Sequence, residues 1–197
     1  MKKLLLVFVW IVIGIGLHAN EVEKMTISCN EGNATSCYQL GMKYDDFGEG
    51  IRRSYDKAIE FYTKACNANH FNACANLGIL YELGNGVKQD YAKALELYGK
   101  ACHGKSGDGC CNLGNMYEHG KGIEADIVKA ENLYQEACFL QSGLGCYKLG
   151  VLYYEYQNPD DSMSVVKSLF REACSLGEIM GCENFELLQK TYRTFEK

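Results

Sequence analysis

Ten of the eleven cysteines in this chain form five pairs, and the two cysteines of every pair are eight residues apart. On one continuous helix such cysteines would lie about 12 Å apart, beyond the roughly 7 Å limit for a disulfide. The segments between them are mostly Gly, Asn, Ser and other turn-forming residues, which allow the chain to reverse. The sequence therefore predicts five disulfides that close five turns: Cys29–Cys37, Cys66–Cys74, Cys102–Cys110, Cys138–Cys146 and Cys174–Cys182.

Metal binding is the competing chemistry for so many cysteines. The C-x-x-C spacing of zinc sites is absent and there are only four histidines, so we expect no metal and no other cofactor. The eleventh cysteine, Cys111, aligns with Tyr38, Ala75, Tyr147 and Glu183, which shows that the pattern does not require a thiol there. Two hypotheses remain for Cys111: a free, partly buried thiol, or a disulfide to a second molecule.

Three short motifs resemble those of serine hydrolases that use a Ser nucleophile with a Lys or Glu base. They are Ser54…Lys57, Ser164…Lys167 and Lys105-Ser106-Gly107. The first serine aligns with Asp90 and Asp126 at the expected start of a helix, and the third motif lies in one of the stapled turns. The histidines at 70, 103 and 119 are scattered, which disfavours a metallo-hydrolase. We assign no catalytic residue.

The cysteine pairs recur every 36 or 37 residues, which is typical of a stack of one repeated unit. Counted from the second cysteine of each pair, positions 3, 4 and 7 hold an apolar residue, a glycine and a tyrosine, which is one face of a helix. Glycine inside a helix costs about 1 kcal/mol relative to Ala, so its recurrence predicts close approach of a neighbouring helix. The tyrosines are predicted to pack in the core. These columns are Gly41, Gly78, Gly114 and Gly150, and Tyr44, Tyr81, Tyr117 and Tyr153.

A G-x-G segment ends this helix in the first three units, at Gly48/Gly50, Gly84/Gly86 and Gly120/Gly122. A second helix is predicted to begin after the N-cap residues Ser54, Asp90, Asp126 and Ser162. In the fourth unit Tyr156 and Asn158 replace the glycines and Pro159 follows, so we expect an irregular loop.

The predicted fold is all-α, a right-handed α-solenoid of disulfide-stapled αα-hairpin repeats. The repeats span approximately residues 34–66, 70–102, 106–138 and 142–174, between an N-terminal cap at 21–30 and a C-terminal cap helix at 178–196. With one proline and no linker-like stretch, residues 20–197 are predicted to form a single domain.

The N-terminus begins with two lysines and an apolar run over residues 4–17, which predicts a signal peptide over 1–19, cleaved after Ala19. The mature chain is then expected to be secreted or periplasmic, where disulfides persist, with no stable membrane anchor. Removal of Lys2 and Lys3 leaves 18 basic against 25 acidic residues, a formal charge of −7. Such a chain disfavours nucleic acid and anionic membranes as partners.

The motifs L-G-x-x-Y, G-x-G and A-x-x-x-Y resemble the Sel-one-like repeat, a relative of the tetratricopeptide repeat, over residues 21–197. With the added cysteine pair, the chain is similar to the Helicobacter cysteine-rich protein family. That resemblance implies a secreted or periplasmic protein that binds penicillin-type compounds and has slow β-lactamase activity.

A row of polar residues at position 2 is predicted to line the concave groove that related helical-hairpin repeats form. Amide side chains there can donate to and accept from an extended peptide backbone; the alternative is a solvated face. The row is Gln39, Asn76, Asn112, Lys148 and Asn184. Position 5 would add apolar pockets, with Met42, Ile79, Asn115, Val151 and Leu187.

Two functions therefore stay open. One is a scaffold whose groove binds a peptide, a host protein or a peptidoglycan fragment. The other is a β-lactam-binding protein with weak amide hydrolase activity, implied by the resemblance alone. We expect a monomer, with a disulfide-linked dimer through Cys111 as the alternative.

Overall fold

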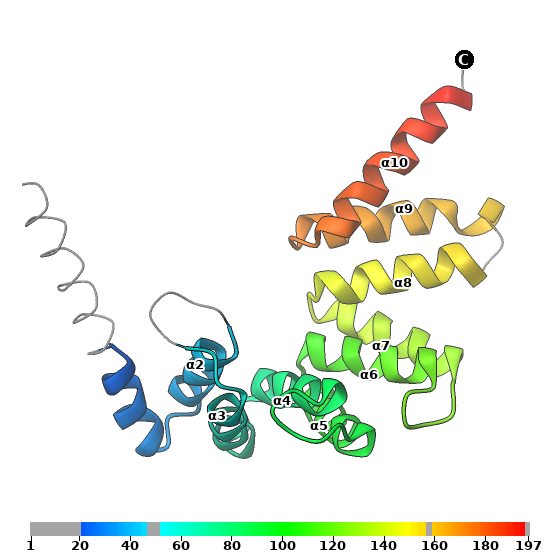
Figure 1. Cartoon of the computed structure of the whole chain (residues 1–197). Coiled ribbons are helices and arrows are strands. Elements are labelled where there is room, and N and C mark those ends of the chain that lie inside the picture. Colours follow the sequence, from blue (N-terminus) through cyan, green and yellow to red (C-terminus); the bar gives the residue numbers. More distant parts are fainter. Residues whose placement is uncertain (1–20, 47–51, 157–158, 196–197) are drawn as a thin grey trace, which may run out of the picture. The chain divides into compact units, whose positions relative to one another are not determined.

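The computed structural model describes residues 21–46, 52–156 and 159–195, and within these ranges the chain is helical with short loops and no strand (Figure 1). The predicted all-α fold is thus confirmed. A helix over residues 21–30 comes first. The others, in chain order, are α2 (Ala34–Asp45), α3 (Tyr55–Asn67), α4 (Phe71–Leu83), α5 (Tyr91–His103), α6 (Gly107–His119), α7 (Ile127–Phe139), α8 (Gly143–Tyr156), α9 (Pro159–Ser175) and α10 (Ile179–Phe195).

The chain divides into two compact units, Met1–Asp90 and Tyr91–Lys197. In the first unit α2 packs on α3 and α3 on α4; in the second, every helix from α5 to α10 packs on the next, as Figure 1 shows for α6 to α10. The first helices of successive repeats also touch, α2 with α4, α6 with α8 and α8 with α10. The single domain over 20–197 stays a prediction. The expected signal peptide lies outside the described residues.

Each predicted cysteine pair is bonded, and its two Cα atoms lie 4.4–4.8 Å apart. Every bond joins the end of one helix to the first turn of the next, across a reversal of about three residues. The staple therefore ties successive hairpins together, because each bond closes the connection between the second helix of one repeat and the first helix of the following one.

The stapled turns share a backbone device that the sequence motifs did not reveal. One residue in every turn has positive φ, between 63° and 96°: Gly32, Asn69, Lys105, Gln141 and Gly177. The next amide then reaches back to the carbonyl five residues earlier, as in Ser106 N to Ala101 O at 3.0 Å, which satisfies the end of the helix. Ser106 at once begins α6, where its Oγ accepts from the Gly109 amide at 3.3 Å.

The recurrent helical glycines make room for an aromatic ring of the second helix. A Cβ added at Gly114 would lie 2.8 Å from the Tyr134 ring, and one added at Gly150 would lie 2.7 Å from the Phe170 ring. Tyr134 is fully buried and Phe170 is 4% exposed. The predicted close approach is therefore real, and the core aromatic residues lie on the second helix. The position-7 tyrosines, in contrast, are half-buried.

The helix boundaries agree with most of the predicted signals. Gly84 and Gly120 end α4 and α6 with φ of 73° and 65°, and Ser54 and Asp126 precede α3 and α7 as N-caps. The prediction for Ser162 was wrong: α9 begins at Pro159, so Ser162 lies inside the helix. Proline suits the first turn of a helix, where its missing N–H is not needed. Gly48, Gly50 and Asn158 lie outside the described residues.

Candidate binding site

The Ser54…Lys57 motif is part of a helix start and not a catalytic pair. Ser54 is the N-cap residue of α3, because its carbonyl accepts from the Ala58 amide at 2.9 Å, and its own amide donates to the Tyr44 carbonyl at 2.8 Å. The Lys57 ammonium lies 4.7 Å from the centre of the Tyr44 ring and donates to its hydroxyl at 3.5 Å. The same contact recurs between Lys129 and Tyr117, at 4.4 Å, so the lysine has a structural role in the repeat.

The other two motifs are also structural. Ser164 and Lys167 lie within α9, where residues three apart share a helix face. Lys105 supplies the positive-φ residue of its turn and forms an ion pair with Glu136 at 2.8 Å, and Ser106 caps α6. Among the described residues no group of three His, Cys, Asp or Glu side chains could hold a metal ion. The described part of the chain also contains no helix that could span a bilayer.

Cys111 is a free thiol in α6 with only 1% of its surface exposed. Burial raises the pKa of this thiol to about 12, so the reactive thiolate is scarce at neutral pH. An intermolecular disulfide would require α6 to separate from its neighbours. The free, buried thiol is the hypothesis that this environment favours.

A buried tyrosine in each unit uses its hydroxyl to bind a polar residue of a neighbouring first helix. In the first unit Tyr62 donates to Asp45 at 3.4 Å and accepts from the Asn76 amide at 3.2 Å. In the second unit Tyr134 of α7 donates to Glu118 of α6 at 2.6 Å. Burial raises the pKa of both phenols well above their usual range, so each hydroxyl stays protonated and donates. The bonds to Asp45 and Glu118 join the two helices of one hairpin, and the bond from Asn76 joins successive hairpins.

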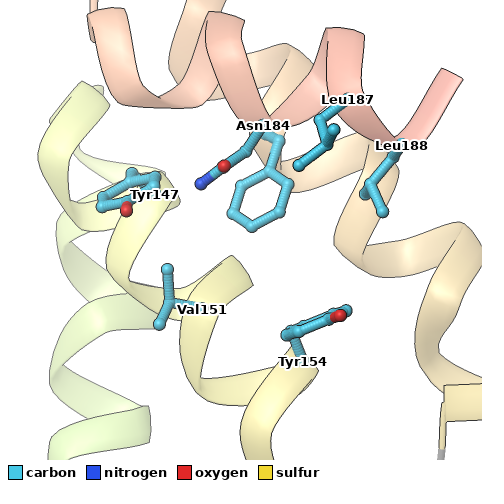
Figure 2. Close-up of a pocket in the computed structure, with 7 residues that line it drawn as sticks. Tyr147, Val151, Tyr154, Asn184, Leu187 and Leu188 are labelled. Atoms are coloured by element: carbon cyan, nitrogen blue, oxygen red, sulfur yellow. The ribbon is translucent and has the colours of Figure 1, made fainter. Parts of the chain in front are cut away.

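The next hairpin of the second unit lacks such a bond and has a cavity of about 260 Å³ instead. Figure 2 shows Tyr147, Val151 and Tyr154 of α8 facing Asn184, Leu187 and Leu188 of α10 across this pocket. Phe170 of α9 contributes the remaining wall, and its ring centre lies 5.8 Å from that of Tyr147.

The lining of the pocket is apolar except for the Asn184 amide and the two tyrosine hydroxyls. Leu187 is 61% exposed and Tyr154 is 53% exposed, so the pocket has a wide mouth. A wide apolar mouth suits a side chain that protrudes from a larger partner, whereas a small molecule would be poorly enclosed. Asn184 can both donate to and accept from a peptide group at the edge.

The predicted groove residues have different surroundings. Asn184, with Val151 and Leu187 of position 5, comes together in the α8–α10 pocket. Asn76 is half-buried and its amide nitrogen donates to the Tyr62 hydroxyl, so this donor already has a partner within the protein. Gln39 is exposed, and Asn112 and Lys148 are half-buried outside the pocket lining. The groove as a continuous binding surface stays a prediction.

Comparison with known proteins identifies the repeat. The Sel1 repeat profile matches residues 34–70, 72–106, 107–138 and 143–164, more than half of the chain. The chain belongs to the Sel1 repeat family. Its five staples, which the Sel1 repeat motifs themselves do not include, make it a disulfide-rich Sel1 repeat scaffold.

Solved Sel1 repeat structures resemble this one. Helicobacter pylori cysteine rich protein B is 30% identical, with a TM-score of 0.52 over 65% of this chain and 91% of its own. The protein c5321, a protective antigen present in uropathogenic Escherichia coli strains, is 27% identical, with a TM-score of 0.68 over 82% of this chain and 34% of its own. The predicted resemblance to the Helicobacter cysteine-rich proteins is thereby confirmed.

A curated relative matches a shorter stretch of this Sel1 repeat protein. Cytochrome c oxidase assembly factor 7A of Xenopus laevis is 37% identical over 57 residues, which is 29% of this chain. The match spans about a quarter of that relative's length, and the c5321 match about a third of c5321. These likenesses concern the repeat itself.

The sequence analysis of this Sel1 repeat protein missed four of the pocket residues: Tyr147, Tyr154, Phe170 and Leu188. A usable signal was present at two of these positions. Tyr154, eight residues after its cysteine, replaces the acid found at Asp45 and Glu118, and Phe170 replaces the tyrosine found at 62 and 134. Both members of an interacting pair therefore differ from the earlier repeats in this hairpin, which is a signal that the sequence alone contains.

Proposed function

We propose that this Sel1 repeat protein is an extracytoplasmic scaffold that binds a segment of another protein on the α8–α10 face of its second unit. Five disulfides favour an oxidising compartment, and export through the N-terminal segment is part of the proposal. The observation that carries the proposal is the apolar pocket beside Asn184, because wide exposed apolar surfaces on a stable fold typically mark interaction sites.

The binding mode follows from the lining. A bulky apolar side chain of the partner would enter between Val151 and Leu187, and its backbone would meet the Asn184 amide at the edge. The rigid floor of Phe170, 4% exposed, keeps the pocket formed without a ligand, which lowers the entropic cost of binding. The hydrolase alternative has no support from the site geometry, since its three candidate motifs lie at a helix start, in a stapled turn and within a helix.

An NMR titration with a blocked hexapeptide tests the proposal. The probe is acetyl-Ser-Gln-Gly-Phe-Gly-Ser-amide, which carries one bulky apolar side chain and no charge. We expect the amide signals of residues 147–154 and 184–188 to shift, and Leu187→Asp to abolish the shifts, because a carboxylate in the mouth opposes apolar burial.

Ile179→Asp is the matched control. Ile179 is 70% exposed on the same helix but does not line the pocket, so this variant should bind the probe like the parent protein. Equal binding by the Leu187→Asp protein, or shifts confined to other helices, would refute the site.

A further inference from the structure

Lys148 is the one basic residue in the predicted row of polar residues, and it has no ion-pair partner in the part of the chain that the structure describes. Other lysines of the chain are paired on the surface, such as Lys64 with Glu60 and Lys105 with Glu136, both at 2.8 Å. Lys148 is half-buried, so part of its hydration has already been lost. A negatively charged group would therefore be stabilised beside the Lys148 ammonium.

Helical spacing places Lys148 at the flank of the pocket-lining face of α8, although Lys148 does not itself line the pocket. Leu144, Lys148, Val151 and Glu155 follow one another at intervals of four, three and four residues on α8, which is a single helix face. Val151 lines the pocket, and Lys148 precedes it by about one turn, roughly 4.5 Å along the axis. Lysine can lay its aliphatic stem along apolar surface and keep its ammonium at the edge.

The neighbouring helix repeats this face. Met180, Asn184 and Leu187 of α10 are the residues 36 positions after Leu144, Lys148 and Val151, and α10 contacts α8. Leu144 is 38% exposed, Met180 is 45% exposed and Leu187 is 61% exposed. A segment lying along these rows would cover apolar surface on both sides of Lys148 and would remove water from its ammonium. That desolvation is costly unless the segment supplies a negative charge.

We infer that the segment bound at the α8–α10 pocket carries an acidic side chain within two residues of its apolar anchor, and that Lys148 pairs with this carboxylate. The inference rests on the proposed function. Glu155, exposed at the other end of the same row and without an ion-pair partner among the described residues, disfavours an acid there. The acidic residue of the segment therefore lies on the side of the pocket nearer the stapled turns.

Three blocked hexapeptides test the inference by NMR titration. They are acetyl-Ser-X-Gly-Phe-Gly-Ser-amide with Glu, Gln or Lys at X, so that the apolar anchor is constant and the C-terminus is uncharged. We expect the Glu probe to bind about three to five times more tightly than the Gln probe, and the Lys probe most weakly. The difference should shrink in high salt, because a partly exposed ion pair is screened.

Lys148→Met keeps the aliphatic stem and removes the charge, so the three probes should bind this variant equally. Lys190→Met is the control: Lys190 is 3.8 Å from Glu186 on α10 and outside the pocket, and its loss should leave the preference intact. Equal binding of the Glu and Gln probes by the parent protein would overturn the inference and leave the proposed function standing. Absence of pocket shifts with all three probes would overturn both.

Discussion

The α6–α7 and α8–α9 hairpins are built from equivalent positions of one repeat, yet the first is joined by a buried polar bond and the second borders an open, apolar pocket. At the first, Tyr134 donates to Glu118 at 2.6 Å and the ring is fully buried. At the second, Phe170 and Tyr154 occupy the same two positions, and a cavity of about 260 Å³ lies beside them. The two hairpins thus differ at a pair of positions, and the hairpin that lacks the polar pair is the one that borders the pocket.

The physical reason is that a buried hydroxyl needs a hydrogen-bond partner. A tyrosine in the core needs an acceptor, so the repeat places a carboxylate on the facing helix, and that bond joins the two helices of the hairpin. Phenylalanine has no hydroxyl and needs no acceptor, so the facing position does not require a carboxylate. That position is Tyr154, whose side chain is 53% exposed. The glycine beneath the ring is kept in both repeats, as Gly114 and Gly150, because both rings need the space.

Removal of the disulfide between α9 and α10 should have the largest effect on stability and on probe binding. Cys174→Ser with Cys182→Ser opens a loop of about nine residues, for which the chain-entropy model gives about 2.5 kcal/mol of lost stability. We expect faster hydrogen exchange in α10 and loss of probe binding, since α10 forms one wall of the pocket.

The matched control for that variant is Cys66→Ser with Cys74→Ser, which breaks a staple of the same spacing in the first unit, where no residue lines this pocket. It should lower stability by a similar amount and keep probe binding. If both variants lost the probe equally, the pocket would depend on the whole array and not on its local hairpin.

A double-mutant cycle at the α6–α7 contact should give the next largest effect. Glu118→Leu leaves the Tyr134 hydroxyl buried without its acceptor, and the free energy of unfolding should fall by about 1–3 kcal/mol. Combining it with Tyr134→Phe should recover much of that loss, because the pair then resembles Phe170 and its apolar surroundings. Urea unfolding of the oxidised proteins measures both, and strictly additive effects would contradict the coupling.

Introducing the tyrosine–carboxylate pair beside the pocket should close it, and we expect this change to have the smallest effect on stability. Phe170→Tyr with Tyr154→Glu restores the acid–tyrosine pair in the α8–α9 hairpin, beside the pocket, so we expect loss of probe binding in the NMR titration while the fold is retained. Tyr154→Phe is the control, since it keeps an aromatic wall and adds no partner for residue 170. Undiminished binding by the double variant would show that the pair does not control the opening.

Most of the fold could be predicted because its signals are local and repeated. The cysteine spacing fixed the turns, and the glycines at 84 and 120 ended their helices as expected. The start of α9 at Pro159 was missed because a serine three residues later fitted the repeat pattern better. The turn residues Asn69, Lys105 and Gln141 were also missed, because only the stapled turn requires their positive φ, a conformation that glycine adopts more easily.

The candidate site could be predicted only in part. Periodicity placed Val151, Asn184 and Leu187 on the first helices, and all three line the pocket. It treated Asn76 as an equivalent amide, but that side chain donates to Tyr62 inside the first unit. Equal positions in a sequence repeat do not ensure equal surroundings, because each position packs against a neighbour whose own residue can differ.

The sequence by itself determined the period, the helical faces, the staples and the membership in a repeat family, since each depends on residues close together in the chain. The tertiary structure alone decided that a pocket opens between α8, α9 and α10. That choice depends on residues from three helices, Tyr154, Phe170 and Leu187, whose side chains meet only after the hairpins have packed. A cavity forms in the space between helices, so the sequence pattern of one helix cannot predict it.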